Sequence, residues 1–364
     1  MNLRFLLLSF CAACSSAAAD HARNVILFIG DAGGVSTLCA ASILAHDKPH
    51  GLFIQHMPCM ALMETSTSDE WLTDSAAAMT AIITGHKTLN GVLSESNGAV
   101  RGHKHGEPLQ TLLEHAEARG LSTGVVTNVT IFDATPAACY AHANERNDPG
   151  LIFAQVLAPH FGDGVDIIIG KGRAKVLQST ALLGIDIVPA LRARGYDVVE
   201  TPSELPQEPV RSVALYDGPD YDPLPVLERI VKGLSKNTKG YFLMLEWDMH
   251  TDNPKRGLDR AIVMDALVKR ATEIAGPDTL IIFTADHSFD LRIRGGRKGE
   301  PLLANLDEKG APAPGTKPAL RIDPSHTGED VLVAAQGPGA ERVRGCIANT
   351  DLFDIMMSAY GWNE

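Results

Sequence analysis

The sequence lacks the excess of positive charge that marks proteins binding a nucleic-acid backbone. Among 364 residues, 32 Lys and Arg are outnumbered by 44 Asp and Glu, which gives a formal net charge of −12. We therefore expect no nucleic-acid partner. The negative charge does not exclude a small phosphate substrate, because bound metal ions can reverse the local field.

Long apolar runs are also scarce, and the one at the N-terminus has the layout of an export signal. Arg4 precedes an apolar run over residues 5–14, and Ala17-Ala18-Ala19 offers a cleavage site before Asp20. The run is too short to span a bilayer, so we expect no transmembrane segment. We predict a signal peptide over residues 1–19 and an exported protein, periplasmic or secreted. A lipid anchor on Cys14 is the weaker alternative, because Cys11 stands where such signals usually carry Leu.

After the predicted signal the cysteines show no Cys-x-x-Cys spacing, and the chain has no internal repeat, no coiled-coil heptad and no clear linker. Four cysteines remain after the predicted signal, all isolated from one another: Cys39, Cys59, Cys139 and Cys346. Export would permit disulfides, but the spacing assigns no pair, and we expect buried free thiols. With 45% hydrophobic residues the chain can build a large core, and we predict one domain over residues 20–364.

Apolar strand patterns alternate with helical patterns along the chain. Strands are predicted at residues 24–29, 123–128, 165–169, 196–200, 240–246, 279–284 and 330–335. Helices are predicted at residues 35–45, 75–84, 108–119, 187–194, 224–235, 257–275 and 349–360. A further helix is predicted after the turn at residues 133–136, and it would carry Tyr140, His142 and Arg146. Residues 202–223 and 291–317, rich in Pro, Gly and charge, are expected to form surface connections. The alternation predicts an α/β fold, a three-layer sandwich around a large, mostly parallel central sheet.

One short helix stands out because a hydroxyl lies at its N-terminus. The Ala-rich, uncharged run from Ser75 to Thr84 ends at Gly85, and either Asp74 or Ser75 is its N-cap. A hydroxyl there faces unpaired N–H groups and the positive end of the helix dipole, where an anionic oxygen is stabilised. Ser75 is therefore a candidate nucleophile for a phosphate, with a plain N-cap as the alternative.

The neighbours of this helix follow a recognisable order along the chain. In sequence order, the chemically competent residues are Asp31, Ser75, Asp133, Thr135, Arg146, Glu246, Asp248, His250, Asp286, His287 and His326. Most follow predicted strands, so they would converge at the carboxyl edge of the sheet. Together these motifs resemble the alkaline phosphatase family over residues 24–361, nearly the whole chain after the signal.

The resemblance implies two Zn²⁺ ions and one Mg²⁺ ion. Asp31 would bridge a zinc and the magnesium, while Asp286 and His287 would complete the zinc site that activates Ser75 as an alkoxide. The reaction would be metal-dependent hydrolysis of a small phosphate monoester through a phosphoserine on Ser75. Arg146 would bind two phosphate oxygens through its planar guanidinium.

The resemblance also implies the second zinc site and the magnesium site. His250 and His326, with a nearby carboxylate, would hold the second zinc, which stabilises the leaving oxygen. We expect His326, in the run Pro-Ser-His-Thr-Gly, to lie in a loop. Thr135 and Glu246 would hold magnesium, with Asp133 orienting its waters. We expect His86 and His142, which the family pattern does not use, to be structural or surface residues.

The segment from Glu246 to His250 departs from the family pattern, in which an Asp lies four residues before the histidine. Here that position is Glu246 itself, and Asp248 is the only carboxylate between the two. Either Asp248 is the carboxylate ligand of the second zinc, at an unusual spacing from His250, or Glu246 is that ligand and the magnesium site loses one. Asp252 is a third choice. The metal preference of both sites stays open.

Of three alternatives to a phosphomonoesterase, two remain. A phosphodiesterase on the same scaffold would prefer a bis-ester, and a sulfatase would need a Cys-x-Pro-x-Arg run, which is absent. A catalytically silent phosphate- or metal-binding protein is suggested by the shortened segment before His250, whereas Ser75 and Arg146 argue against it. The sequence does not fix the oligomeric state, with a homodimer as one alternative.

Overall fold

A computed structural model describes residues 21–362. The predicted signal peptide and Cys14 lie outside the described residues.

A ten-stranded sheet forms the centre of the described chain, in the order β12-β2-β11-β8-β1-β7-β3-β4-β6-β5. Within it β11 runs antiparallel to β2 and β8, and the other neighbouring pairs are parallel. Its strands are β1 (Asn24–Asp31), β2 (Cys59–Glu64), β3 (Ser122–Thr130), β4 (Ile167–Lys171), β5 (Asp197–Val199), β6 (Ser212–Tyr216), β7 (Tyr241–Asp248), β8 (Thr279–Thr284), β11 (Val331–Gln336) and β12 (Gly345–Ala348).

Helices cover both faces of this sheet. The α-helices are α1 (Val35–His46), α2 (Ser75–Thr84), α3 (Leu112–Ala118), α4 (Ala134–Tyr140), α5 (Pro149–Ala154), α6 (Arg173–Leu182), α7 (Ile187–Ala193), α8 (Pro223–Leu234), α9 (Pro254–Ile274) and α10 (Asp351–Ala359). Short 3-10 helices are η1 (Ile54–His56), η2 (Pro202–Glu204) and η3 (Ala340–Arg342).

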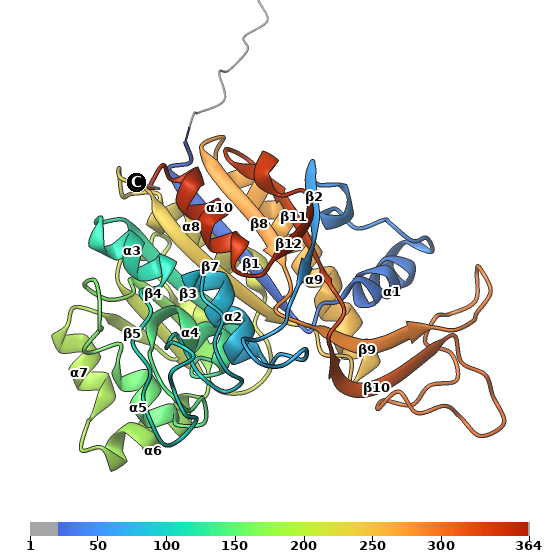
Figure 1. Ribbon diagram of the computed structural model, residues 1–364, viewed down its shortest axis with the longest axis horizontal. Helices are drawn as coiled ribbons and strands as arrows, with labels where there is room; N and C mark the ends of the chain where they lie inside the picture. Colours follow the sequence, from blue (N-terminus) through green and yellow to red (C-terminus); the bar gives the residue numbers. More distant parts are fainter. Residues whose placement is uncertain (1–20, 363–364) are drawn as a thin grey trace, which may run out of the picture.

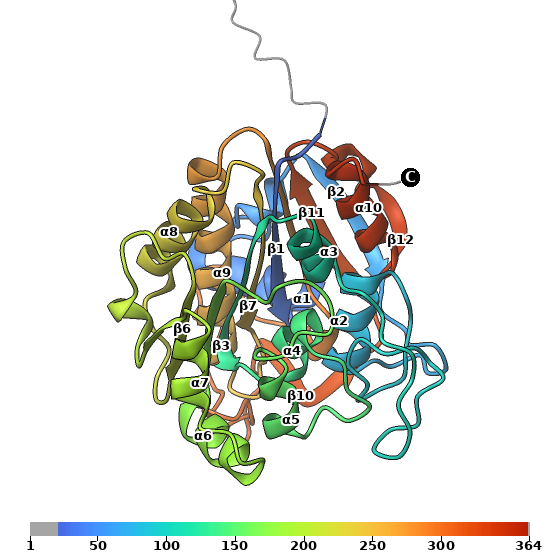
Figure 2. The ribbon, with the colours of Figure 1, turned by 90° about the vertical axis from the view of Figure 1, so that its left-hand side faces the viewer.

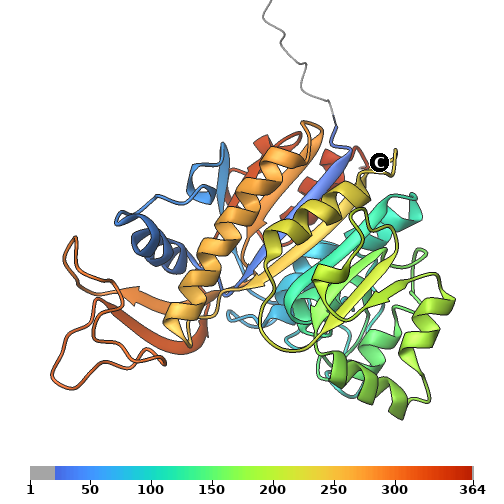
Figure 3. The same cartoon turned by 180° about the vertical axis from the view of Figure 1, so that it is seen from behind.

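The two faces carry separate hydrophobic cores. One core joins α2, α3, α4 and α10 to the sheet, and the other joins α1, α8 and α9 to the opposite face. Figure 2 shows the sheet edge-on between these helices, and Figure 3 shows α8 and α9 lying across the sheet. The predicted three-layer α/β fold with a mostly parallel sheet is confirmed.

The central strands form where the sequence is apolar on both faces. All eight residues of β1 and all six of β8 are buried, as expected for strands covered by helices on each side. The helix α9 that lies on them starts at an Asn253 cap followed by Pro254, an order that favours helix initiation. The polar residues that end these strands are therefore held on a rigid frame.

The structure corrects several predicted elements. Residues 202–223 were expected to be surface connections, yet they contain the fully buried strand β6, Ser212–Tyr216. The helix predicted at 108–119 begins only at Leu112, because Thr111 and Glu114 form a capping box. The excursion predicted at 291–317 begins within β9 (Ser288–Ile293), which pairs with β10 (Leu320–Thr327) in a two-stranded ribbon projecting from the body (Figure 1).

The described cysteines, Cys39, Cys59, Cys139 and Cys346, are free thiols as predicted, but only Cys139 is fully buried and Cys346 is exposed. His142 is a structural histidine, buried between Glu114 and the Ser94 carbonyl. Within residues 21–362 no single helix has the length and apolar character to cross a membrane, whereas the bent pair α6 and α7 meets that test by length and composition only.

Candidate active site

Three neighbouring parallel strands bring the predicted acidic residues together. The strands β8, β1 and β7 are adjacent, and Asp31 at the end of β1 is in register with Asp248 at the end of β7. Asp286 follows the last residue of β8, Thr284, by two positions. The carboxyl edge of a parallel sheet is where open α/β folds bind ligands. The predicted convergence at this edge is observed.

The helix α2 places Ser75 in this crevice. Its N-cap is Asp74, whose Oδ1 accepts a hydrogen bond from the Ala77 N–H at 3.0 Å. Because Asp74 provides the cap, the Ser75 hydroxyl is free of that role, and its Oγ lies 3.3 Å from Nε2 of His287. Every residue of α2 is buried, so the position of Ser75 is fixed by packing. The alternative that Ser75 is only a cap is excluded.

Asp31, Asp286 and His287 form the first group of potential metal ligands. The Nε2 atom of His287 lies 3.5 Å from Asp31 Oδ1 and 3.4 Å from Asp286 Oδ2. Both of these buried oxygens have no hydrogen-bond partner within residues 21–362. Buried carboxylate oxygens without partners are costly, and a cation among them would remove that cost. The donor set therefore fits a metal ion.

The electrostatics of this group point the same way. Burial, and then the negative charges of Asp286 and Glu246, raise the pKa of Asp31 well above its ordinary value. Burial lowers the pKa of His287 to about 4, so its ring is neutral at physiological pH. The Nδ1 atom of His287 lies 3.1 Å from the Ser288 carbonyl, which places the ring proton there and leaves the Nε2 lone pair for a metal.

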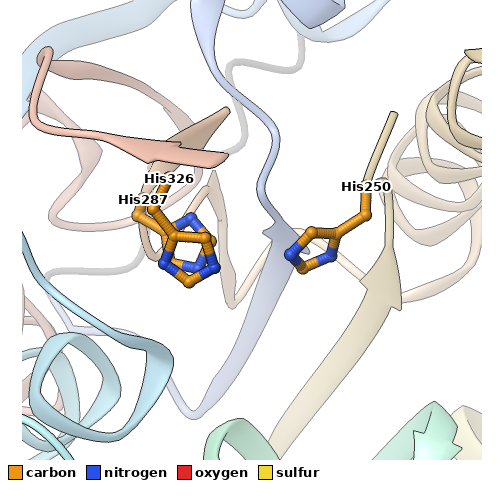
Figure 4. Close-up of side chains that lie close together, drawn as sticks. All are labelled: His250, His287 and His326. Carbon is orange, nitrogen blue, oxygen red and sulfur yellow. The ribbon is translucent and has the colours of Figure 1, made fainter. Parts of the chain in front are cut away.

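A second group contains His250, His287 and His326. The rings of His287 and His326 stack with their centroids 3.7 Å apart, and His250 lies with its centroid 5.8 Å from each. Figure 4 shows the His250 ring pointing toward this stacked pair from the opposite side. His326 was expected in a loop, but it lies in β10 and pairs with Phe289 of β9, so a strand fixes it.

Glu246 lies apart from these groups, with two threonines. Its Oε2 accepts a short hydrogen bond from Thr127 of β3. Burial raises the pKa of the Glu246 carboxyl well above its ordinary value, and the hydroxyls of Thr127 and of the predicted partner Thr135 partly offset that rise. The structure thus places Glu246 beside Thr135 and not beside His250. Thr127 was missed by sequence reasoning, although a hydroxyl near the end of a predicted strand next to β7 was an available signal.

Arg146 is held between two carboxylates, Asp74 and Asp133, at the N-terminal ends of α2 and α4. Its Nη1 donates to Asp74 Oδ2 at 3.0 Å and its Nη2 to Asp133 Oδ1 at 2.7 Å. The helix predicted to carry Arg146 ends at Tyr140, so the prediction of a helical arginine was wrong. The loop instead anchors the arginine backbone, whose N–H donates to the Gly91 carbonyl at 2.9 Å.

Comparison with known proteins identifies the family. The sequence profile of the alkaline phosphatase family matches residues 22–180 and 224–304. The chain is 31% identical to alkaline phosphatase from Escherichia coli, over 93% of this chain and 86% of that protein. It is 30% identical to streptomycin-6-phosphate phosphatase from Streptomyces griseus, over 93% of this chain and 91% of that protein. The chain belongs to the alkaline phosphatase family.

Solved structures of alkaline phosphatases share the fold. That from the Antarctic bacterium TAB5 superposes with a TM-score of 0.77 at 21% identity, over 94% of this chain and 100% of its own. That from Thermus thermophilus has a TM-score of 0.77 at 20% identity, over 99% of this chain and 96% of its own. A TAB5 mutant was solved with Mg bound. Family membership makes the present protein a phosphatase.

This alkaline phosphatase departs from the family pattern at Asp248. The structure brings Asp248 within reach of Asp31 and His250, in a third group of potential ligands. The third choice, Asp252, is exposed and pairs with Arg256 at 2.9 Å, away from these groups. Of the carboxylates considered from the sequence, Asp248 alone therefore lies beside His250 on the β7 side.

Proposed function

We propose that this phosphatase hydrolyses phosphate monoesters through a phosphoserine intermediate on Ser75. The observation that carries the proposal is the Ser75 hydroxyl, 3.3 Å from the neutral ring of His287 and next to unpartnered oxygens of Asp31 and Asp286. The family relatives support the substrate class, since one of them is named for streptomycin-6-phosphate.

The chemistry divides between Ser75 and Arg146. Ser75 Oγ gives its proton to solvent and attacks the phosphorus, and the ester P–O bond breaks so that the alcohol leaves with a proton taken from solvent. Water then attacks the same phosphorus and gives up a proton, the bond between phosphorus and Ser75 Oγ breaks, Oγ regains a proton, and inorganic phosphate is released. Arg146, already clamped by Asp74 and Asp133, would use its remaining N–H groups to hold two phosphate oxygens in line.

Metal ions would supply Lewis-acid stabilisation of the reacting oxygens. We propose a zinc ion held by Asp31, Asp286 and His287, and a second zinc at His250 and His326. We propose Mg²⁺ near Thr135, Glu246 and Asp31, with Asp133 orienting its waters. Carboxylate oxygens and imidazole nitrogens are the ligands these ions prefer.

The test is turnover of a simple aryl phosphate at alkaline pH by mature, metal-loaded protein, with inorganic phosphate as the product measured. The variant Ser75→Ala should lose nearly all activity, and quenched wild-type reactions should yield a phosphorylated Ser75 peptide. Ser179→Ala is a matched control, a buried helical serine outside the site (8% exposed, against 5% for Ser75). Inactive wild-type protein with zinc, magnesium, manganese or calcium, or faster turnover of a bis-ester, would overturn the monoesterase assignment.

The predicted signal over residues 1–19 supports export of the enzyme to the periplasm or the medium. We propose that residues 20–364 form its single catalytic domain.

A further inference from the structure

The carboxylate of Asp248 is fully hydrogen-bonded, unlike those of the first metal group. Its Oδ1 accepts from His250 Nδ1 at 2.8 Å and from the His250 backbone N–H at 3.0 Å. Its Oδ2 is in close contact with Nη1 of Arg260, on α9. By contrast, Asp31 Oδ1 and Asp286 Oδ2 have no hydrogen-bond partner within residues 21–362. The oxygens of Asp248 are therefore already committed, whereas those two are available to a metal.

Arg260 is fixed by a second carboxylate. Its Nε and Nη2 donate to the two oxygens of Asp220, at 2.8 and 3.1 Å, in a bidentate pair. Lys171 donates to Asp220 at 2.6 Å. The side chains of Arg260 and Asp248 are only 13% and 14% exposed. Two acidic and two basic side chains thus form one balanced and largely buried network, in which Arg260 has a single well-defined orientation.

Asn128 closes the network on the backbone side. Its Oδ1 accepts from the Asp248 N–H at 2.9 Å, and its Nδ2 donates to Asp220 Oδ2 at 3.3 Å. Both the main chain and the carboxylate of Asp248 are thereby tied to Asp220. A metal that took Oδ1 of Asp248 would have to displace His250 from it, and one that took Oδ2 would have to share that oxygen with the cation of Arg260.

The orientation of His250 follows from these contacts. A carboxylate bonded to Nδ1 places the ring proton on that atom and leaves the lone pair on Nε2. Figure 4 shows the ring directed toward His287 and His326, with a nitrogen on that side. A carboxylate behind a metal-binding imidazole is a common outer-shell arrangement that fixes the tautomer and raises the basicity of the ligand.

We propose that Asp248 is a positioning residue for His250 and not a ligand of the second metal, and that Arg260, held by Asp220, keeps it in that role. The inference rests on the proposed function, because it requires a metal at His250. The proposal gives one answer to the question, left open by the sequence, of how Asp248 is used beside His250. The unusual spacing of Asp248 and His250, with one residue between them, suits a carboxylate that supports the histidine from behind.

The test is titration of the metal-free protein with Co²⁺, whose visible spectrum reports the ligands around the ion. Arg260→Met should weaken binding of the cobalt equivalent held by His250 by about 10–100-fold, the usual effect of losing an outer-shell partner. That equivalent is identified as the one lost in His326→Ala. Arg260→Lys, which keeps the cation, should restore part of the affinity, whereas the equivalent at Asp286 should not change.

Arg270→Met is the matched control. Arg270 lies on the same helix and also bridges two carboxylates, Glu228 and Glu273, but it is 38% exposed and has no contact with Asp248. Its replacement should leave both cobalt equivalents unchanged. Equal behaviour of Arg260→Met and Arg270→Met would overturn the inference. Should Arg260→Met fail to fold by circular dichroism, Asp220→Asn tests the same prediction.

Asp248→Asn separates a positioning residue from a ligand. The asparagine oxygen can still accept from His250 Nδ1, so the cobalt bands should keep their positions and intensities while affinity falls. A change of the bands as large as that in His326→Ala would show a lost ligand and overturn the inference. Wild-type protein that binds no metal and has no turnover would overturn the proposed function itself, before any variant is compared.

Discussion

The two halves of the site differ in how their carboxylates are used. On the side of Ser75, Asp31 and Asp286 each keep one buried oxygen without a hydrogen-bond partner in the described chain. On the side of His250, Asp248 has both oxygens bonded to protein groups. Buried acceptors are normally satisfied, so the unsatisfied ones mark where a cation is needed. The first half therefore offers charged oxygen donors to a cation, and the second offers mainly imidazole nitrogens.

The largest effect should come from the Ser75 half. Asp286→Asn removes the charge of an unpartnered oxygen while keeping the shape of the side chain. We expect loss of metal from that group and a fall in kcat of about a thousandfold, because metal stabilisation of a phosphoryl transition state is worth several kcal/mol. The measurements are kcat with an aryl phosphate and metal content by elemental analysis.

Asp265→Asn provides the control for this variant. Asp265 is half-buried, whereas Asp286 is fully buried, and both oxygens of Asp265 accept hydrogen bonds, from the Phe53 and Ile54 N–H groups at 3.0 and 2.8 Å. Its replacement should alter stability and leave metal content intact. Full metal content and full activity in Asp286→Asn would contradict the assignment of unpartnered oxygens to a metal.

Replacement of Arg146 should give the next largest effect, and it should not change metal binding in either half of the site. Arg146→Ala removes a guanidinium that would make charge-assisted bonds to phosphate, so kcat/KM should fall about a hundredfold or more. Arg146→Lys should recover only a small part, because an ammonium cannot reproduce the planar fork. Metal content should stay at the wild-type level in both variants.

Arg101→Ala is the comparison for this prediction. Arg101 pairs with Glu145, next to Arg146 in sequence, at 3.0 Å and is 43% exposed. Its loss should hardly affect kcat/KM. Equal losses in the two alanine variants would mean that Arg146 acts through the local fold and not through the phosphate.

A smaller effect should appear in the pH dependence of the metal-free protein. Burial lowers the pKa of His287 to about 4, below the ordinary value of about 6.5 that it has in the unfolded chain. Between these values the unfolded state binds more protons, so stability falls as pH drops from about 6.5 to about 4. Urea unfolding of chelator-treated protein at several pH values measures this slope.

The variant His287→Gln isolates that contribution. Its stability should depend less on pH over the same interval, because one proton-linked group has been removed. A variant whose stability falls with pH as steeply as that of the wild type would show that folding does not lower the pKa of His287.

The first half of the site was readable from the sequence because its residues are set by local pattern. The apolar runs that lead to Asp31, Glu246 and Asp286 are continuous, and parallel strands bring their carboxyl ends to one edge. The short helix after Asp74 can also be predicted, from its Ala-rich composition and from Gly85, which ends it. These signals act within a few residues, so a single sequence reveals them.

The second half depends on contacts that no local pattern encodes. Arg260 reaches Asp248 because α9 packs beside β7, and Asp220 reaches Arg260 from a segment that reads as irregular. The position of Arg146 was misjudged for a similar reason. Ala143 pairs with Leu93, and this long-range bridge, which propensity does not foresee, lies in the extended segment after α4.

The smallest effect should come from a buried carboxylate outside both halves. Glu117 accepts hydrogen bonds from the Gly164 N–H at 3.0 Å and from Thr123 at 3.2 Å, and burial raises its pKa to about 8. Between about pH 4.5 and pH 8 the folded state keeps a proton on Glu117 that the unfolded state loses. The stability that Glu117 contributes is therefore lost as the pH rises through that range. Glu117→Gln mimics the protonated acid. The variant should be more stable than the wild type at pH 9 by thermal unfolding, and equal to it at pH 4, with unchanged metal content.

A gain in stability that is the same at both pH values would indicate a packing effect. Loss of metal in this variant would break the distinction between carboxylates that are satisfied by the protein and those that need a cation.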